Sequence, residues 1–499
     1  MDHKISICHN SWLQSSLYLI NFILRISQGI NKLSQINLLF HGIIVGIIIF
    51  QTSIIAPTVF KTINPKETSI FLRIIFPKFF IFILSLVFFL ISCDDNNNEE
   101  ARPNILLVIA DDMGLDASPS YNFGLKKPTT PNITNLISKG IIFDNVWAYP
   151  TCTPTRSSII TGKYGFRTGV MNVDDELPLS EPSLFKFFKN SSTYSTAVIG
   201  KWHLSKDSNH PYLTGVDFYS GLLTGSVNSY FNWDLTQNNT TVQNTDYITS
   251  KFTDIAINWL KERNEPWFLW LAYNAPHAPF HLPPLSLHER SELPNDQANI
   301  DSNPIDYYLS MIEAMDAELG RLIDSLNEDV LENTIIIFLG DNGSPRKVAQ
   351  DFNSKRVKGT VYQGGISVPM YISGKGVLRK NDREDALINT TDLFSTILEI
   401  AGINNSETND SYSFKKILSE DGNYDRNYIY SEIGDDNISD VAIRDRTHKY
   451  IKFGDGSEAL YNLRENFLEY PNLLNNPLTD EDNIALDSLL KKLNELHNN

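Results

Sequence analysis

The chain has 499 residues, of which 42% are hydrophobic, and it carries a formal net charge of −17. That length accommodates one large domain or two ordinary ones, and the composition supplies a substantial core. The acidic balance argues against a nucleic-acid partner, because phosphate backbones are bound by basic surfaces. The three cysteines, Cys8, Cys93 and Cys152, cannot form a disulfide framework.

The first hundred residues contain an apolar run at 79–91 that follows two basic residues. The run is short for a transmembrane helix and is typical of the hydrophobic region of a signal peptide. It ends in Leu90-Ile91-Ser92-Cys93, which resembles a bacterial lipobox, so residues 69–93 are expected to form a lipoprotein signal peptide. The resemblance implies a lipidated Cys93 that anchors the protein in the outer membrane, on its periplasmic or cell-surface face. A plain signal peptide or a signal anchor is the alternative.

The segments on either side of this signal have different compositions. Residues 94–100 are acidic and polar, and they lack the apolar side chains that offset the entropy of ordering, so we expect a solvated tether at 94–101. Residues 1–68 precede the signal, where no segment is expected, and they include a second apolar patch at 43–50. They are either an additional membrane segment or the product of a start site placed too far upstream.

From residue 102 onward, short apolar runs alternate with segments of helical period. Short runs rich in β-branched or aromatic residues predict buried strands, here at 104–110, 196–199, 267–273, 334–339 and 368–372. Segments 305–326 and 391–401 predict helices. The alternation predicts an α/β sandwich with a large, mostly parallel central sheet. We place this domain in residues 102–425.

The pattern changes at about residue 428. Three short apolar runs at 441–444, 449–453 and 459–463 are separated by polar turns, which predicts an antiparallel meander. Residues 479–497 predict a closing helix, with Thr479 as its N-cap ahead of three acidic residues. Residues 426–499 are therefore expected to form a small C-terminal subdomain with an antiparallel sheet.

Polar side chains follow four of the predicted strands, at the point where each strand ends. They are Asp111 and Asp112, then Lys201 and His203, then His277, and finally Asp341 and Asn342. Open α/β sheets bind ligands at the carboxyl ends of their strands, so these residues are expected to lie together. The carboxylate and amide oxygens favour Ca²⁺ or Mg²⁺ over Zn²⁺. Two unrelated turns would also account for the Asp and Asn residues.

Residues 150–162 contain the pattern Cys152-x-Pro154-x-Arg156, followed by Thr161-Gly162. Considered alone, Cys152 would be a buried structural cysteine in a turn. The whole pattern resembles the signature of the type I sulfatases of the alkaline phosphatase superfamily, which implies an alkaline-phosphatase-like sandwich. The resemblance further implies that a formylglycine-generating maturation enzyme oxidises Cys152 to Cα-formylglycine, whose hydrate attacks sulfur.

Other segments carry the same resemblance. Residues 193–203 look like a second sulfatase signature, although Thr193 stands where a glycine is usual. His277 lies between two prolines as in the family, and Lys358 precedes a glycine-rich stretch in which Gln363 stands where glutamate is usual. The resemblance implies catalytic roles for Cys152, Arg156, Lys201, His203, His277 and Lys358. It also implies one Ca²⁺, or less favourably Mg²⁺, on Asp111, Asp112, Cys152, Asp341 and Asn342.

The resemblance assigns a role to each of these side chains. Arg156 would hold the hydrated nucleophile, which the metal and Asp341 would activate. His277 or Lys358 would protonate the departing alcohol, and His203 would be the base that regenerates the aldehyde. Lys201 and His203 are expected to point to the same side because they are two apart on an extended segment.

The chain is therefore expected to be an arylsulfatase-like sulfuric ester hydrolase. Its expected substrate is a sulfated polysaccharide or oligosaccharide, with specificity set by loops at 217–245 and 281–304. One alternative is a formylglycine-dependent phosphonate or phosphate ester hydrolase of the same superfamily. The other is a non-catalytic lipoprotein that binds sulfated glycans.

Overall fold

The computed structural model describes residues 102–498 except 192, 405–409, 420–423, 425 and 436–437, together with Asn64 and Lys66. The chain divides into two compact units, Met1–Glu100 and Ala101–Asn499. The predicted extension at 1–68 (those two residues apart), the signal peptide at 69–93 with the lipidated Cys93, and the tether at 94–101 lie outside the described residues. Within the described part of the chain, no helix is long and apolar enough to cross a membrane.

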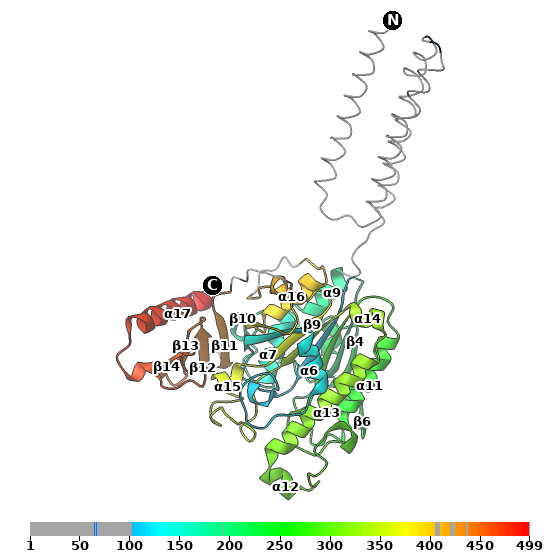
Figure 1. Ribbon diagram of the computed structural model, residues 1–499, viewed down its shortest axis with the longest axis horizontal. Helices are drawn as coiled ribbons and strands as arrows, with labels where there is room; N and C mark the ends of the chain where they lie inside the picture. The colour runs from blue at the N-terminus through cyan, green and yellow to red at the C-terminus, as the bar shows by residue number, and fades with distance from the viewer. Residues whose placement is uncertain are drawn as a thin grey trace. The chain divides into compact units, whose positions relative to one another are not determined.

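A ten-stranded sheet runs through the second unit in the order β10-β2-β9-β8-β1-β7-β3-β4-β5-β6 (Figure 1). Strand β10 pairs with β2 in parallel, and β8, β1, β7, β3 and β4 pair in parallel in turn. Strand β9 runs antiparallel to both of its neighbours, and the pairs β4–β5 and β5–β6 are also antiparallel. The strands are Asn104–Ala110 (β1), Gly140–Trp147 (β2), Ser195–Lys201 (β3), Phe218–Leu222 (β4), Trp233–Gln237 (β5), Thr240–Asn244 (β6), Trp267–Tyr273 (β7), Thr334–Gly340 (β8), Met370–Gly374 (β9) and Asp382–Asn389 (β10). The predicted mostly parallel α/β sheet is confirmed.

Both faces of the central strands are buried, which is why these strands are apolar throughout. In β1, Leu106 and Val108 belong to one core, and Ile105 and Leu107 belong to the core on the opposite face. The first core contains residues of α6 (Pro131–Ser138), α11 (Ile248–Lys261) and α13 (Pro304–Asp324). The second contains residues of α7 (Cys152–Thr161), α9 (Leu184–Ser191) and α16 (Asp392–Ile400). The sheet is therefore the middle layer of a sandwich.

Residues 217–245, expected as a loop, fold instead into β4, β5 and β6 at one end of the sheet. The outer strand β6 is mostly exposed and polar, with the sequence Thr-Thr-Val-Gln-Asn, so it has no apolar pattern to reveal it. The other outer strand, β10, begins with charged residues, some of them exposed, so its first half likewise has no apolar pattern. The strand expected at 368–372 begins after Pro369, because proline cannot donate to a ladder.

The C-terminal region forms a separate antiparallel sheet in the order β11-β12-β13-β14. Its strands are Ile429–Gly434, Ser439–Arg444, His448–Lys452 and Glu458–Asn462, and α17 (Asp480–Asn498) packs against it through leucines (Figure 1). The predicted meander and closing helix are confirmed. The Thr479 hydroxyl accepts from the Asp482 N–H at 3.2 Å, so Thr479 is the N-cap. The domain boundary between 425 and 426 stays a prediction.

The remaining helices are short and connect these layers. They are η3 (Leu115–Ala117), α8 (Gly165–Thr168), α10 (His210–Leu213), η4 (Leu285–Leu287), α12 (Gln297–Ser302), α14 (Glu328–Glu332), α15 (Gln363–Ile366), η5 (Lys415–Leu418) and η6 (Leu473–Asn475). Two of them, η4 and α12, lie in the segment 281–304 that was expected as a loop.

Candidate active site

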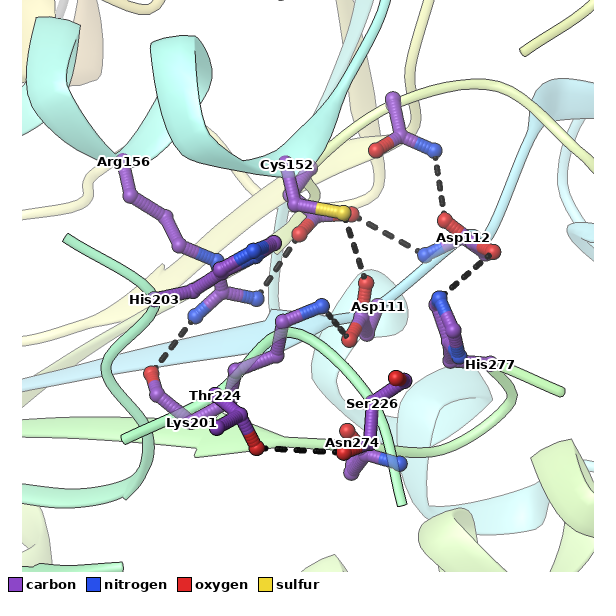
Figure 2. A network of polar contacts seen from close by, with 12 residues as sticks. Asp111, Asp112, Cys152, Arg156, Lys201, His203, Thr224, Ser226, Asn274 and His277 are labelled. Atoms are coloured by element: carbon purple, nitrogen blue, oxygen red, sulfur yellow. Dashed lines mark hydrogen bonds and ion pairs between the residues drawn. The ribbon is translucent and has the colours of Figure 1, made fainter. Parts of the chain in front are cut away.

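The predicted site residues meet at the carboxyl edge of the large sheet (Figure 2). They come from the ends of four strands, β1, β3, β7 and β8, from the start of α7, and from the segment before α15. The residues brought together are Asp111, Asp112, Cys152, Arg156, Lys201, His203, His277, Asp341, Asn342 and Lys358. In this structure the strand ends converge at one edge of the sheet, as the sequence predicts.

Three buried carboxylates form the centre of this site. Oxygens of Asp111, Asp112 and Asp341 and the sulfur of Cys152 all lie within 4.8 Å of one another. Asn342 joins them through its Nδ2, which donates to Asp112 Oδ1 at 2.8 Å. Its Oδ1 is buried and has no hydrogen-bond partner among the described residues, which is costly unless something else binds it. A set of carboxylate oxygens with an unsatisfied amide oxygen fits a hard cation such as Ca²⁺ or Mg²⁺.

Each carboxylate is also paired with a cationic side chain. Lys201 Nζ contacts Asp111 Oδ2, and Lys358 Nζ lies 2.5 Å from Asp112 Oδ1. Burial is the largest single influence and favours the neutral acid at Asp111. The nearby positive charges, with Lys201 the largest of them, together outweigh it and hold the pKa of Asp111 well below its usual range. Burial also favours neutral Lys358, yet the Asp112 carboxylate raises the pKa of that amine. These pairs keep the site charged although it is buried.

Arg156 supports the third carboxylate, Asp341. Its Nη2 donates to Asp341 Oδ2 at 2.7 Å, and its Nη1 donates to the backbone carbonyl of Lys201 at 2.7 Å. Burial, followed by the charge of Asp111, raises the pKa of Asp341. The guanidinium therefore links the end of β3 to a carboxylate of the centre. The expected contact of Arg156 with a hydrated nucleophile stays a prediction.

Cys152 is the first residue of α7 and is 1% exposed. Its sulfur lies 3.4 Å from Asp111 Oδ1 and 3.8 Å from Lys358 Nζ. Pro154 is tolerated because the first turn of a helix needs no N–H donor from it. Burial, and then the Asp111 carboxylate, raise the pKa of the Cys152 thiol to about 12. Near neutral pH this side chain is a thiol and not the reactive thiolate.

His277 follows β7 and is partly exposed, at 17% of its side chain. Its Nε2 lies 3.8 Å from Asp112 Oδ2, and its Nδ1 lies 2.7 Å from the carbonyl of Ala278. A carbonyl only accepts hydrogen bonds, so Nδ1 carries a proton and Nε2 faces the site. The hydroxyl of buried Tyr230 lies 2.6 Å from the carbonyls of both Asn274 and His277 and fixes this turn.

The backbone conformation at His203 differs from the sequence prediction. Its φ is 56°, so the backbone is left-handed there, and the extended geometry expected between Lys201 and His203 is wrong. Its Nε2 lies 3.0 Å from Asp174 Oδ1. Gly225 packs against the same ring, because a Cβ there would lie 2.3 Å from His203 Nε2.

Several residues of this site carry no signal in the sequence. Figure 2 draws Thr224, Ser226 and Asn274 in the same network of polar contacts as Lys201, and the Thr224 hydroxyl donates to the Ser226 carbonyl at 3.1 Å. Asp174 and Tyr230 belong to no motif, so only their tertiary contacts reveal them. Asn274 was within reach of sequence reasoning, because it directly follows the predicted strand at 267–273.

The mixed α/β sheet with a buried group of carboxylates at its carboxyl edge defines an alkaline-phosphatase-like fold. The sequence profile of the Sulfatase family matches residues 103–403, more than half of the chain. The chain belongs to the sulfatase family. A second profile, N-sulphoglucosamine sulphohydrolase, C-terminal, matches residues 352–499, and a domain of unknown function matches residues 39–109.

Curated relatives agree with this assignment. The chain is 30% identical to the uncharacterized sulfatase YdeN of Escherichia coli K12, over 61% of this chain and 63% of that protein. It is 28% identical to arylsulfatase J of Mus musculus, over 60% of this chain and 53% of that protein. A sulfatase of Formosa agariphila is 25% identical over 83% of this chain and 92% of its own length. The chain thus spans less than two thirds of the length of the first two.

Solved structures share the fold. Ps i-CgsB in complex with k-i-k-neocarrahexaose is similar with a TM-score of 0.68 and 25% identity, over 79% of this chain and 92% of that chain. A structure bound to its substrate, D-glucosamine-2-N,6-O-disulfate, has a TM-score of 0.67 and 21% identity, over 80% of this chain and 99% of that chain. The second likeness concerns the fold alone.

Proposed function

We propose that this protein hydrolyses sulfate esters. The observation that carries the proposal is the position of Cys152, the cysteine of the Cys-x-Pro-x-Arg pattern, at the start of α7. Its side chain lies against the Asp111 carboxylate and within 3.8 Å of the Lys358 amine. Because the chain belongs to the sulfatase family, we assign sulfate ester hydrolysis to the side chain at this position.

The second part of the proposal is that a formylglycine-generating maturation enzyme converts Cys152 to Cα-formylglycine. The hydrated aldehyde would supply an oxygen nucleophile for sulfur. Burial supports this step indirectly, because the unmodified thiol has its pKa raised to about 12 and is a poor nucleophile near neutral pH.

The third part is a resident Ca²⁺, with Mg²⁺ as the less favoured ion. Residues that would hold it are Asp111, Asp112, Asp341, Asn342 and the side chain at position 152. Such an ion supplies positive charge beside the nucleophile and a sulfate oxygen. The unpartnered Asn342 Oδ1 and the oxygen-rich donor set support this choice.

The chain's own side chains would complete the chemistry. Lys201 and Lys358 neutralise charge that builds on the sulfate oxygens, since both amines already face the centre. His277 turns Nε2 to the site and is partly exposed. In its doubly protonated form it would donate the Nε2 proton to the departing alcohol and be left with Nδ1–H, with Lys358 as the alternative acid. His203 is the base that takes a proton in the following step. Arg156 keeps the Asp341 carboxylate in place.

We propose a sulfated polysaccharide or oligosaccharide as the substrate. Support comes from the solved relative in complex with k-i-k-neocarrahexaose, to which this chain is 25% identical. The net charge of −17 repels polyanions at long range, so the binding site must be locally cationic, and salt should soften the long-range repulsion.

Paired substrates test the proposal. Purified enzyme should hydrolyse nitrophenyl sulfate and desulfate a sulfated oligosaccharide, and Cys152→Ala should abolish both activities. A matching phosphonate monoester should be a much poorer substrate. Preference for the phosphonate would favour the phosphonate hydrolase alternative, and binding of sulfated glycan without turnover would favour a binding lipoprotein.

Membrane attachment through a lipidated Cys93 is a further proposal, motivated by the lipobox resemblance. A multiply acylated cysteine anchors a protein firmly, whereas one chain binds marginally. Cys93→Ala should move the protein out of the detergent phase. Unchanged retention of that variant would count against the lipid anchor.

A further inference from the structure

Asp174, in the connection between α8 and α9, contacts the imidazole of His203. Its Oδ1 lies 3.0 Å from His203 Nε2. Its backbone N–H donates at 3.2 Å to the hydroxyl of Thr153, the residue after Cys152. Its φ of 66° is a left-handed conformation that residues other than glycine seldom adopt. The loop is thus held against both the imidazole and the helix that carries Cys152.

This contact decides which ring nitrogen of His203 carries the proton. A carboxylate only accepts hydrogen bonds, so the proton shared with Asp174 belongs to Nε2. Burial first, and then the charges of Lys201 and Arg156, lower the pKa of His203, so the resting ring is neutral and has one N–H. Nδ1 is then a bare lone pair. It is buried and has no hydrogen-bond partner in the part of the chain that the structure describes.

Gly225 closes the Nε2 side of the same ring. A Cβ at this position would lie 2.3 Å from both Cε1 and Nε2 of His203. The ring is 5% exposed, so it has little room to move away. Asp174 and Gly225 therefore fix the imidazole from one edge, and Nδ1 on the other edge has no hydrogen-bond partner among the described residues.

We propose that Asp174 is a positioning residue that holds the proton of His203 on Nε2, so that Nδ1 is the proton acceptor of the site. The inference rests on the proposed function, in which His203 removes a proton from a hydroxyl group beside α7. In that transfer the O–H bond breaks, its electron pair stays on oxygen, and the proton forms a bond to Nδ1. The positive ring that results is paired with the Asp174 carboxylate, which offsets the nearby cations.

The tautomer can be measured without turnover. We would record ¹⁵N NMR spectra of the full-length, calcium-loaded protein labelled at histidine, in a Cys152→Ala background, and assign His203 from a His203→Gln variant. The expected spectrum has a protonated Nε2 and an unprotonated Nδ1. Asp174→Ala should mix the two tautomers or favour the other one. An unchanged His203 spectrum in Asp174→Ala would overturn the proposal.

Kinetics of the mature enzyme give the second readout. Asp174→Ala should lower kcat with little change in KM, by about 10–100-fold if the loss is as large as when the outer partner of a metal-ligating histidine is removed. Asp174→Asn should recover part of kcat, since its amide oxygen can still accept from Nε2, and Gly225→Ala should resemble Asp174→Ala. The matched control is Asp175→Asn. The native Asp175 carboxylate accepts from the backbone N–H groups of Met171 and Asn172, so this substitution should leave His203 unaffected.

The outcomes separate this inference from the proposed function. A wild-type enzyme without sulfatase activity would defeat the proposed function and leave the NMR result standing. Wild-type kcat in Asp174→Ala, or an equal loss in Asp175→Asn, would overturn the positioning role of Asp174.

Discussion

Two clusters of buried charge in this protein differ in how completely their polar atoms are bonded. Near α16, Asp392 accepts from the backbone of Asn389 and Tyr412, from the Tyr424 hydroxyl and from Arg426. The Arg426 guanidinium has a partner for every nitrogen. At the carboxyl edge of the sheet, by contrast, four buried atoms lack partners among the described residues: Asn342 Oδ1, His203 Nδ1, Arg156 Nε and Asn274 Oδ1.

The difference separates a structural ion pair from a site built for ligands. Removing one partner of a satisfied buried pair leaves the other charge buried and unpaired, so a single substitution there destabilises the fold. An unsatisfied cluster has lone pairs available for a cation or a reacting group. Substitutions in the first cluster should therefore change stability, and substitutions in the second should change chemistry.

The largest effect is expected from Asp111→Ala at the site. It removes one of the three central carboxylates and the partner of Lys201, so calcium binding and turnover should both be lost, with turnover falling about 10³-fold or more. Elemental analysis and a nitrophenyl sulfate assay measure the two effects. Calcium retained at one ion per chain in this variant, or stoichiometric zinc in the native enzyme, would contradict the assignment of the centre.

His277→Ala should separate two kinds of substrate. A sugar alkoxide is a poor leaving group and needs a proton, so we expect a loss of about 10²–10⁴-fold on a sugar sulfate. The nitrophenolate anion is stable, so nitrophenyl sulfate should suffer far less. Arg156→Ala is the comparison variant and should harm both substrates to a similar extent. Equal losses for His277→Ala would remove His277 from the general-acid role and leave it as a sulfate-binding residue.

Arg426→Ala tests the structural cluster. It leaves the buried Asp392 carboxylate without its cation, so the free energy of unfolding should fall by about 3–5 kcal/mol. Urea denaturation measures the loss, and the fraction that remains folded should keep its kcat. A stable variant with a large loss of kcat would break the distinction between the two clusters.

Glu432 gives the smallest predicted effect, and it depends on pH. Burial outweighs the hydrogen bond from Tyr430 and raises the pKa of Glu432 from 4.5 to about 7. Between those values the folded state keeps a proton that the unfolded state has released, so stability should fall as pH rises from about 4.5 to about 7, by on the order of 1–3 kcal/mol. Thermal unfolding across this range should show the slope in the native protein, and Glu432→Gln should flatten it.

The sequence predicts those strands whose side chains are all buried. Strands β1, β7 and β8 are buried on both faces and are apolar throughout, so their position was predictable. The outer strands β6 and β10 are polar or charged over much of their length, because one edge meets solvent. Such strands lack the alternation or the apolar run on which a prediction depends.

At the candidate site, too, only residues that belong to a sequence pattern could be predicted. The residues with fixed sequence patterns, from Asp111 to Lys358, meet at one edge as expected. Asp174, Gly225 and Tyr230 belong to no pattern, and their importance comes from contacts between segments far apart in the sequence. The left-handed backbone at His203 was likewise not predictable, since tertiary contacts impose it.

The central claim is that an aldehyde at position 152 does the chemistry of this site. Mass spectrometry of the peptide that contains Cys152, taken from fully active enzyme, tests it most directly. The peptide is expected to have lost its sulfur and to react with a hydrazide as an aldehyde does, in proportion to the active fraction. Fully active enzyme in which that peptide carries only an unmodified cysteine would contradict it.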